Sequence, residues 1–229
     1  MNLYVGSCRY MNSLIWKSYF PPRLHTTKEI IYFLNNINKI NELQKIYNND
    51  LLNIIFGDCY HESVKKQFTK FVKNINSYVN FINIFCAEIS SRKLYYHDDI
   101  PINYFYTTDE LITKYNLKYH ILTDDELKND IIEINNLVKN IFNENTQFIV
   151  ITHVDLKLKT TNDYIMDRHV FVNLIETICY QLSIKCINPS LYFQQNDIFY
   201  FGDVTKNDTT HYSKKGKQMI YKHIIKSIN

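Results

Sequence analysis

The sequence predicts an α/β fold, a doubly wound three-layer sandwich built on a mainly parallel sheet of five strands. Helical patterns separate successive apolar runs of strand length, and no two-residue hairpin turn joins neighbouring runs. Buried strands that alternate with helices are typical of a parallel sheet covered on both faces. The five runs span residues 3–5, 51–56, 78–89, 148–152 and 184–188.

Two capping boxes mark the starts of predicted helices. Thr26 is followed three residues later by Glu29, and Thr123 is followed in the same way by Glu126. The apolar pattern after each box predicts helices that reach about residue 43 and about residue 142. Further helical patterns cover residues 62–75, 164–182 and 213–228.

Length and composition favour one domain that spans residues 1–229. The chain is 45% hydrophobic and has only four glycines and four prolines, so it can bury a sizeable core and shows no linker. Residues 93–120 have no clear period and are predicted to form an insertion over the rim of the site. Its tyrosine and phenylalanine side chains could stack on sugar rings or an acyl chain, or could pack beneath a long loop.

Charge and cysteine content exclude several classes of protein. A net charge of +3 without a basic stripe argues against nucleic acid as a partner, and no apolar run is long enough to cross a membrane. The five cysteines form no Cys-x-x-Cys pair, and no leader segment precedes the first strand, so we expect an intracellular, reducing compartment. Histidine spacing and the lack of a phosphate loop predict no metal and no cofactor. The richness in Asn, Ile, Lys and Tyr is typical of an AT-rich genome.

The two ends of the chain carry residues suited to acyl transfer. Ser7 stands in a Gly6-Ser7-Cys8 turn after the first strand, and Asp208 precedes His211 near the other end. A serine hydroxyl needs an imidazole to take its proton and a carboxylate to orient that imidazole. We therefore predict Ser7 as nucleophile; the alternative is a serine that caps the first helix.

Two other arrangements stay open. Asp58, Cys59 and His61 form a second triad-like segment, which could also be a capped turn between a strand and a helix. Cys8, next to Ser7, could be the nucleophile in place of the serine.

Further polar residues follow predicted strands and are candidates for oxyanion or substrate binding. Because the carboxyl ends of parallel strands meet at one edge of a sheet, these side chains are expected at the edge that carries Ser7. Arg9 and Arg92 could bind an anionic group of the substrate or be solvated. Glu88 could orient Arg92 or neighbours of Ser7. His153 could contact the substrate or simply lie at the rim of the site. The candidates are Arg9, Glu88, Ser91, Arg92 and His153.

The two ends of the chain carry motifs that resemble the SGNH, or GDSL-like, hydrolase superfamily. These motifs are the Gly6-Ser7-Cys8 turn and, near the other end, Asp208 and His211 followed by Tyr212-Ser213 and Gly216. The Gly-Ser-Cys opening is most similar to its GSCFA-type branch. Gly-Ser-Cys replaces the usual Gly-Asp-Ser, and residues 85–92 stand where the family has Gly-x-Asn-Asp, so the second oxyanion donor is unidentified.

The resemblance implies a flavodoxin-like sheet and a serine hydrolase or acyltransferase acting on O-acyl esters, chiefly O-acetyl groups on carbohydrate. Ser7 would attack the carbonyl, His211 would relay the proton, and Asp208 would orient His211. The missing Asn favours an alternative, a catalytically silent module that keeps the fold and binds glycan. A nucleotide-binding α/β domain is a third reading, and it lacks a phosphate loop. The oligomeric state does not follow from the sequence.

Overall fold

The computed structural model describes residues 2–6, 24–39, 81–98, 100–104, 109–157 and 161–192, with scattered positions between 213 and 226. The elements in these residues follow a mixed α/β order. They are β1 (Asn2–Val5), α1 (Thr27–Asn35), β2 (Ile84–Ile89), β3 (Lys93–His97), β4 (Ile100–Tyr104), α5 (Asp109–Lys114), β5 (Lys118–Ile121), α6 (Asp124–Ile141), β6 (Gln147–Thr152), α7 (Met166–Gln181), β7 (Lys185–Ile187) and a 3-10 helix at Pro189–Tyr192.

The main sheet has four strands in the order β1-β2-β6-β7. β1 pairs with β2 in parallel, Leu3 opposite Phe85, and β6 pairs with β7 in parallel, Val150 opposite Cys186. The structure therefore confirms an α/β fold with a mainly parallel sheet, and these four strands coincide with predicted apolar runs. The strand predicted at 51–56 and the helix predicted at 62–75 lie outside the described residues.

The chain divides into two compact units. One comprises Met1–Gly6 and Ser18–Phe148, and the other comprises Ser7–Lys17 and Ile149–Asn229. The single domain expected from composition stays a prediction.

The core of the first unit is formed by β1, β2 and two helices. All six residues of β2 are buried, and the ring of Phe85 stacks on Phe142 at a centroid distance of 5.8 Å. α6 buries Leu127, Ile131, Ile134 and Val138, a spacing of three to four residues that gives one apolar face. Both predicted capping boxes are present, since Thr26 and Thr123 each accept from the backbone N–H of the glutamate at N3.

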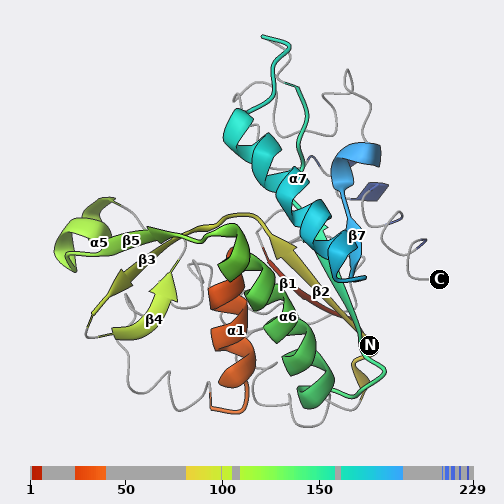
Figure 1. Ribbon diagram of the computed structural model, residues 1–229, viewed down its shortest axis with the longest axis horizontal. Helices are drawn as coiled ribbons and strands as arrows, with labels where there is room; N and C mark the ends of the chain where they lie inside the picture. The colour runs from red at the N-terminus through yellow and green to blue at the C-terminus, as the bar shows by residue number, and fades with distance from the viewer. Residues whose placement is uncertain are drawn as a thin grey trace. The chain divides into compact units, whose positions relative to one another are not determined.

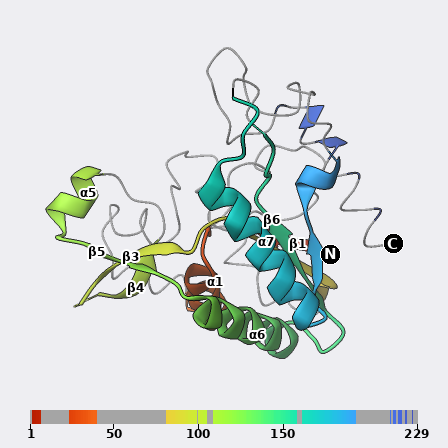
Figure 2. The same cartoon turned by 45° about the horizontal axis from the view of Figure 1, so that its top comes forward.

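α1 and α6 lie side by side and are joined by a buried polar contact (Figures 1 and 2). The Thr27 hydroxyl donates to Asp130 Oδ2 and Lys28 Nζ donates to Asp130 Oδ1, both at 2.6 Å. Both oxygens of this buried carboxylate therefore have a partner, which is the condition for a buried charge to be tolerated.

β3, β4 and β5 form a second sheet, antiparallel, in the order β4-β3-β5 (Figure 2). The segment in which the sequence shows no clear period thus contains regular strands, and β3 pairs antiparallel with β4. The pattern was hard to detect because all four residues of β5 are exposed, so no apolar alternation marks the strand. Its place over the rim of a site stays a prediction.

The second unit contains the carboxyl end of β6, together with α7 and β7. α7 buries Phe171, Val172, Ile175, Ile178 and Cys179. Contact with the Cys179 thiol, together with burial, raises the pKa of Cys186 well above its usual range, so this thiol stays protonated.

Among the described helices, none has the length and apolar character that crossing a membrane requires.

Asp130→Ala should lower the free energy of unfolding by about 2 kcal/mol, because it leaves the buried Thr27 hydroxyl without its acceptor. Urea denaturation near neutral pH measures this loss. Asp98→Ala is the matched control, since the Asp98 carboxylate is exposed and pairs with Lys118 at the surface, so little change is expected. Equal effects of the two substitutions would contradict a bracing role for Asp130.

Glu126→Gln should remove an acid-dependent part of the stability. Bonds from the Thr123 backbone N–H and from the His120 ring lower the Glu126 pKa from 4.5 to about 2. A carboxyl group with a lowered pKa stabilises the fold above its unfolded value of 4.5, and this stabilisation is lost as the pH falls through about 2. The difference in unfolding free energy between parent and variant should therefore be present near neutral pH and disappear at the acid end. A difference that does not change with pH would contradict the assignment.

Candidate functional site

The predicted catalytic residues Ser7, Asp208 and His211 lie outside the described residues, as does Arg9. The alternatives Cys8, Asp58, Cys59 and His61 also lie outside them. The described residues include Gly6, which immediately precedes Ser7, and the candidates Glu88, Ser91, Arg92 and His153.

Gly6 ends β1 in a conformation that suits only glycine. Its φ is +143°, a region that residues with a side chain rarely adopt. A Cβ atom at this position would lie 2.6 Å from the Glu88 Cβ and 3.1 Å from the Tyr4 hydroxyl. The Gly6 backbone therefore lies close to the Glu88 side chain, near the end of β2.

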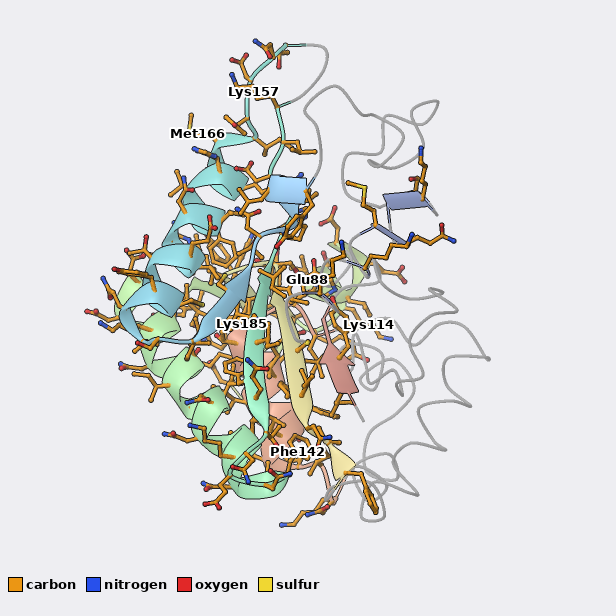
Figure 3. The ribbon with its side chains drawn as sticks, turned by 90° about the vertical axis from the view of Figure 1, so that its right-hand side faces the viewer. Glu88, Lys114, Phe142, Lys157, Met166 and Lys185 are labelled. Atoms are coloured by element: carbon orange, nitrogen blue, oxygen red, sulfur yellow. The ribbon has the colours of Figure 1, made fainter. Side chains whose placement is uncertain are left out.

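Glu88 is a fully buried carboxylate at the carboxyl end of β2 (Figure 3). The Tyr4 hydroxyl, from the neighbouring strand β1, donates to Glu88 Oε2 at 2.7 Å. The parallel register, with Val5 opposite Ala87, brings these two side chains to the same end of the strand pair. Glu88 thus contacts both the side chain and the backbone of the segment that leads to Ser7.

Ser91 and Arg92 make contacts of a structural kind. The backbone N–H of Ser91 donates to the His25 carbonyl at 3.2 Å, and the Ser91 hydroxyl accepts from the Lys93 backbone N–H at 3.0 Å. Arg92 forms an exposed ion pair with Asp124 at 3.3 Å. These contacts fix the turn from β2 to β3, and a role in substrate binding stays a prediction for both residues.

His153 follows β6 in the second unit and is buried. Its Nδ1 lies 2.7 Å from the Val154 carbonyl oxygen, which only accepts, so Nδ1 carries the hydrogen. Contact of His153 with substrate or an oxyanion stays a prediction.

The structure also forms a histidine–aspartate pair that the sequence reasoning missed. His169 Nδ1 lies 2.6 Å from Asp155 Oδ2, and the Tyr164 ring stacks on the imidazole at 4.3 Å between centroids. Asp155 comes from the loop after β6, and His169 comes from the first turn of α7. The position of Asp155 after a buried strand was the available signal, but His169 lies 14 residues further along the chain, without a motif to connect them.

Hydrogen bonds hold the loop that carries Asp155. The Asp155 backbone N–H donates to Ser190 Oγ at 2.6 Å, and the Ser190 N–H donates to Asn188 Oδ1 at 2.9 Å. The Asn188 amide in turn donates to Glu176 Oε2 at 3.0 Å. The main-chain position of Asp155 is therefore fixed from the 3-10 helix and from α7.

No three histidine, cysteine, aspartate or glutamate side chains within the described residues are grouped so that they could hold a metal ion. The absence of metal and cofactor stays a prediction for the chain.

Residues 110–227 match the family described as TviD N-terminal domain. The chain belongs to this family. The match covers more than half of the chain, including β5, α6, β6, α7 and the segment that contains Asp208 and His211.

Comparison with solved structures finds a protein from Parabacteroides merdae described as a "putative GDSL-like lipase". The two share 13% sequence identity over 96% of this chain and 91% of that chain, with a TM-score of 0.44. A likeness this weak carries no argument about activity, so the SGNH superfamily and its GSCFA-type branch stay predictions. No curated protein matches the chain significantly.

Gly6→Ala should destabilise the first unit by about 2 kcal/mol or more, because it adds strain at φ +143° and a clash with the Glu88 Cβ. The midpoint of thermal unfolding, followed by circular dichroism, measures the change. An unchanged midpoint would contradict the positive φ of Gly6 and its close approach to Glu88.

Proposed function

We propose that this member of the TviD N-terminal domain family is a serine-dependent hydrolase or acyltransferase that acts on O-acyl esters, chiefly O-acetyl groups on carbohydrate. Ser7 attacks the ester carbonyl, His211 takes its proton, and Asp208 holds His211 in the required tautomer. The Ser7 backbone N–H and a second donor, not yet identified, stabilise the oxyanion.

The conformation of Gly6, immediately before Ser7 in the sequence, is the observation that carries this proposal. A nucleophile at the end of a strand needs a sharp change of direction immediately before it, so that its hydroxyl and its N–H face the same open space. The positive φ of Gly6 and its close approach to Glu88, at the carboxyl end of β1, favour such a change of direction and so support the proposal. In parallel α/β folds this is the end of a strand where ligands bind.

Glu88 and Tyr4 support the proposal because they pack against Gly6. A buried carboxylate is costly unless hydrogen bonds compensate it, and the Tyr4 hydroxyl provides one. Both partners lie next to the space that a Cβ at Gly6 would occupy, so the packing around them restricts the Gly6 backbone. Arg9, Ser91, Arg92 and His153 are proposed as residues that contact the substrate or the oxyanion.

A glycan-binding module without catalysis is the second candidate, and the β4-β3-β5 sheet favours it. Tyr119 is 61% exposed, and its ring lies edge-on to that of Tyr95 at 6.5 Å between centroids. Lys93 Nζ lies 4.7 Å from the centre of the Tyr119 ring. Exposed aromatic rings can stack on sugar rings whether or not the chain has catalytic activity.

Ser7→Ala should abolish turnover of an aryl acetate while leaving thermal unfolding unchanged, because the variant lacks the nucleophile and a turn hydroxyl contributes little to stability.

His211→Ala should lower turnover about a thousandfold, and Asp208→Asn should lower it less, because the geometry around the imidazole survives. Release of the aryl alcohol, followed by absorbance, measures all three.

Full activity of Ser7→Ala together with rapid inactivation by iodoacetamide would move the nucleophile to Cys8. Full activity of His211→Ala would instead bring Asp58 and His61 forward. Absence of turnover in the parent, with retained binding of glycan, would favour the silent module.

A further inference from the structure

Thr152 and Asp155, at the carboxyl end of β6, each bury a polar atom that has no hydrogen-bond partner. Within the described residues, Thr152 Oγ1 and Asp155 Oδ1 are the two side-chain atoms of this kind. Thr152 is fully buried, and the Asp155 side chain is 6% exposed. Because an unpaired buried polar group costs stability, two of them at the end of one strand favour a functional role.

Asp130, in the first unit, shows how this protein pairs a buried carboxylate that has a structural role. Both of its oxygens accept hydrogen bonds, from Thr27 and from Lys28. Asp155 uses only Oδ2, which lies 2.6 Å from His169 Nδ1, and its Oδ1 is unbonded. A carboxylate that served only to join the loop after β6 to α7 would gain nothing from an unbonded oxygen.

His169 extends this group of polar residues toward solvent, since its side chain is 34% exposed. Asp155 Oδ2 accepts the hydrogen of Nδ1, so Nε2 carries the lone pair of the neutral ring. The amide nitrogen of Asn173, an exposed residue of α7, lies 3.2 Å from Nε2. A hydroxyl group that arrives from solvent could replace this amide as the donor to Nε2.

The charges nearby restrict the ligand to a neutral donor of hydrogen bonds. Asp155 Oδ1 and His169 Nε2 can only accept, and the carboxylate disfavours an anion. The Tyr164 ring stacks on the imidazole at 4.3 Å between centroids, and Lys157 Nζ lies 5.6 Å from the centre of the Tyr164 ring. The lysine charge disfavours a cationic ligand in the same place. Nor does the described part of the chain group three side chains that could hold a metal ion.

We propose that Thr152, Asp155 and His169 form a binding site for a neutral molecule with several hydroxyl groups, of the sugar class. One ligand hydroxyl donates to His169 Nε2 as the exposed Asn173 side chain moves aside. A second hydroxyl donates to Asp155 Oδ1, and Thr152 Oγ1 exchanges a hydrogen bond with the same part of the ligand.

The proposed site lies within one compact unit of the chain. Thr152, Asp155, His169 and Asn173 all belong to the unit that contains Ile149–Asn229. The inference requires binding alone, so it does not rest on Ser7 or on the proposed function. It also concerns a different part of the chain from the aromatic side chains of the β4-β3-β5 sheet.

Nuclear magnetic resonance of the full chain, isotope-labelled at the histidine ring nitrogens, tests the site. The probes are the methyl α-glycosides of glucose, galactose and mannose, and tetrahydropyran, a similar ring without hydroxyl groups, is the control probe. We expect at least one glycoside to shift the His169 signals in a saturable way, and tetrahydropyran to leave them unchanged. The spectrum of His169→Gln identifies these signals.

Thr152→Val separates a binding role from a structural one. Valine has the shape of threonine without its hydroxyl, so the variant should be at least as stable as the parent in urea, because it loses an unpaired buried group. Its affinity for the glycoside that binds the parent should be about fivefold lower, the effect of one lost hydrogen bond.

Asp155→Asn should lower the affinity by about tenfold or more. Asparagine can donate to Nδ1, which leaves the hydrogen on Nε2, so that Nε2 no longer accepts from the ligand. His120→Gln is the matched control, since His120 also pairs with a carboxylate, that of Glu126, at 3.0 Å. Its affinity should equal that of the parent.

The inference would be overturned if none of the three glycosides gave a saturable shift. An unchanged affinity in folded Thr152→Val and Asp155→Asn, or an equal response to tetrahydropyran, would also overturn it. So would a shift with methylammonium or inorganic phosphate but with no glycoside, because the ligand would then be charged. If Asp155→Asn does not fold, Thr152→Val decides.

A Ser7→Ala variant keeps this test apart from that of the proposed function. The glycoside should shift the His169 signals in this variant as in the parent, whatever its turnover of an aryl acetate. Loss of the shift in folded Ser7→Ala would contradict a site that is independent of Ser7.

Discussion

The close contact between Gly6 and Glu88 is the constraint on which the candidate site depends. At the end of β1 the backbone comes so near to the Glu88 side chain that no residue other than glycine fits at position 6. The positive φ of Gly6 favours glycine there for a second, independent reason. The Tyr4 hydroxyl completes the arrangement, because it compensates the buried carboxylate that takes part in the contact. A side chain of ordinary size at position 6 would press against Glu88 on β2, so the conformation of Gly6 is linked to the packing of β1 on β2.

The two units treat buried carboxylates in different ways. In the first unit, Asp130 is bonded through both oxygens and joins α1 to α6. In the second, Asp155 is bonded through one oxygen to an imidazole that is partly exposed. The first arrangement satisfies the carboxylate fully, and the second leaves Oδ1 of a buried carboxylate unbonded at some cost in stability.

Local signals in the sequence predicted much of the fold. Each capping box lies within four residues, and the apolar runs that became β1, β2, β6 and β7 are continuous, so neither depends on distant parts of the chain. The β4-β3-β5 sheet was missed because β5 is exposed along its length, and a strand without a buried face has no periodic pattern.

The site was harder to predict because it depends on contacts between distant residues. Glu88 was a candidate from its place at the end of a strand, but its contact with Tyr4 spans 84 residues. The pairing of Asp155 with His169 follows from the packing of α7, which no spacing in the sequence reveals. For Ser7, Asp208 and His211, which lie outside the described residues, the assignment stays a prediction from the sequence.

The most direct test of the central claim is to treat the full chain with a fluorophosphonate and to locate the modified residue by peptide mass spectrometry. An activated serine reacts with this reagent, whereas a serine that only caps a helix does not. The account predicts one modification, at Ser7. A chain that stays unmodified, or that carries the label on another serine, would contradict it.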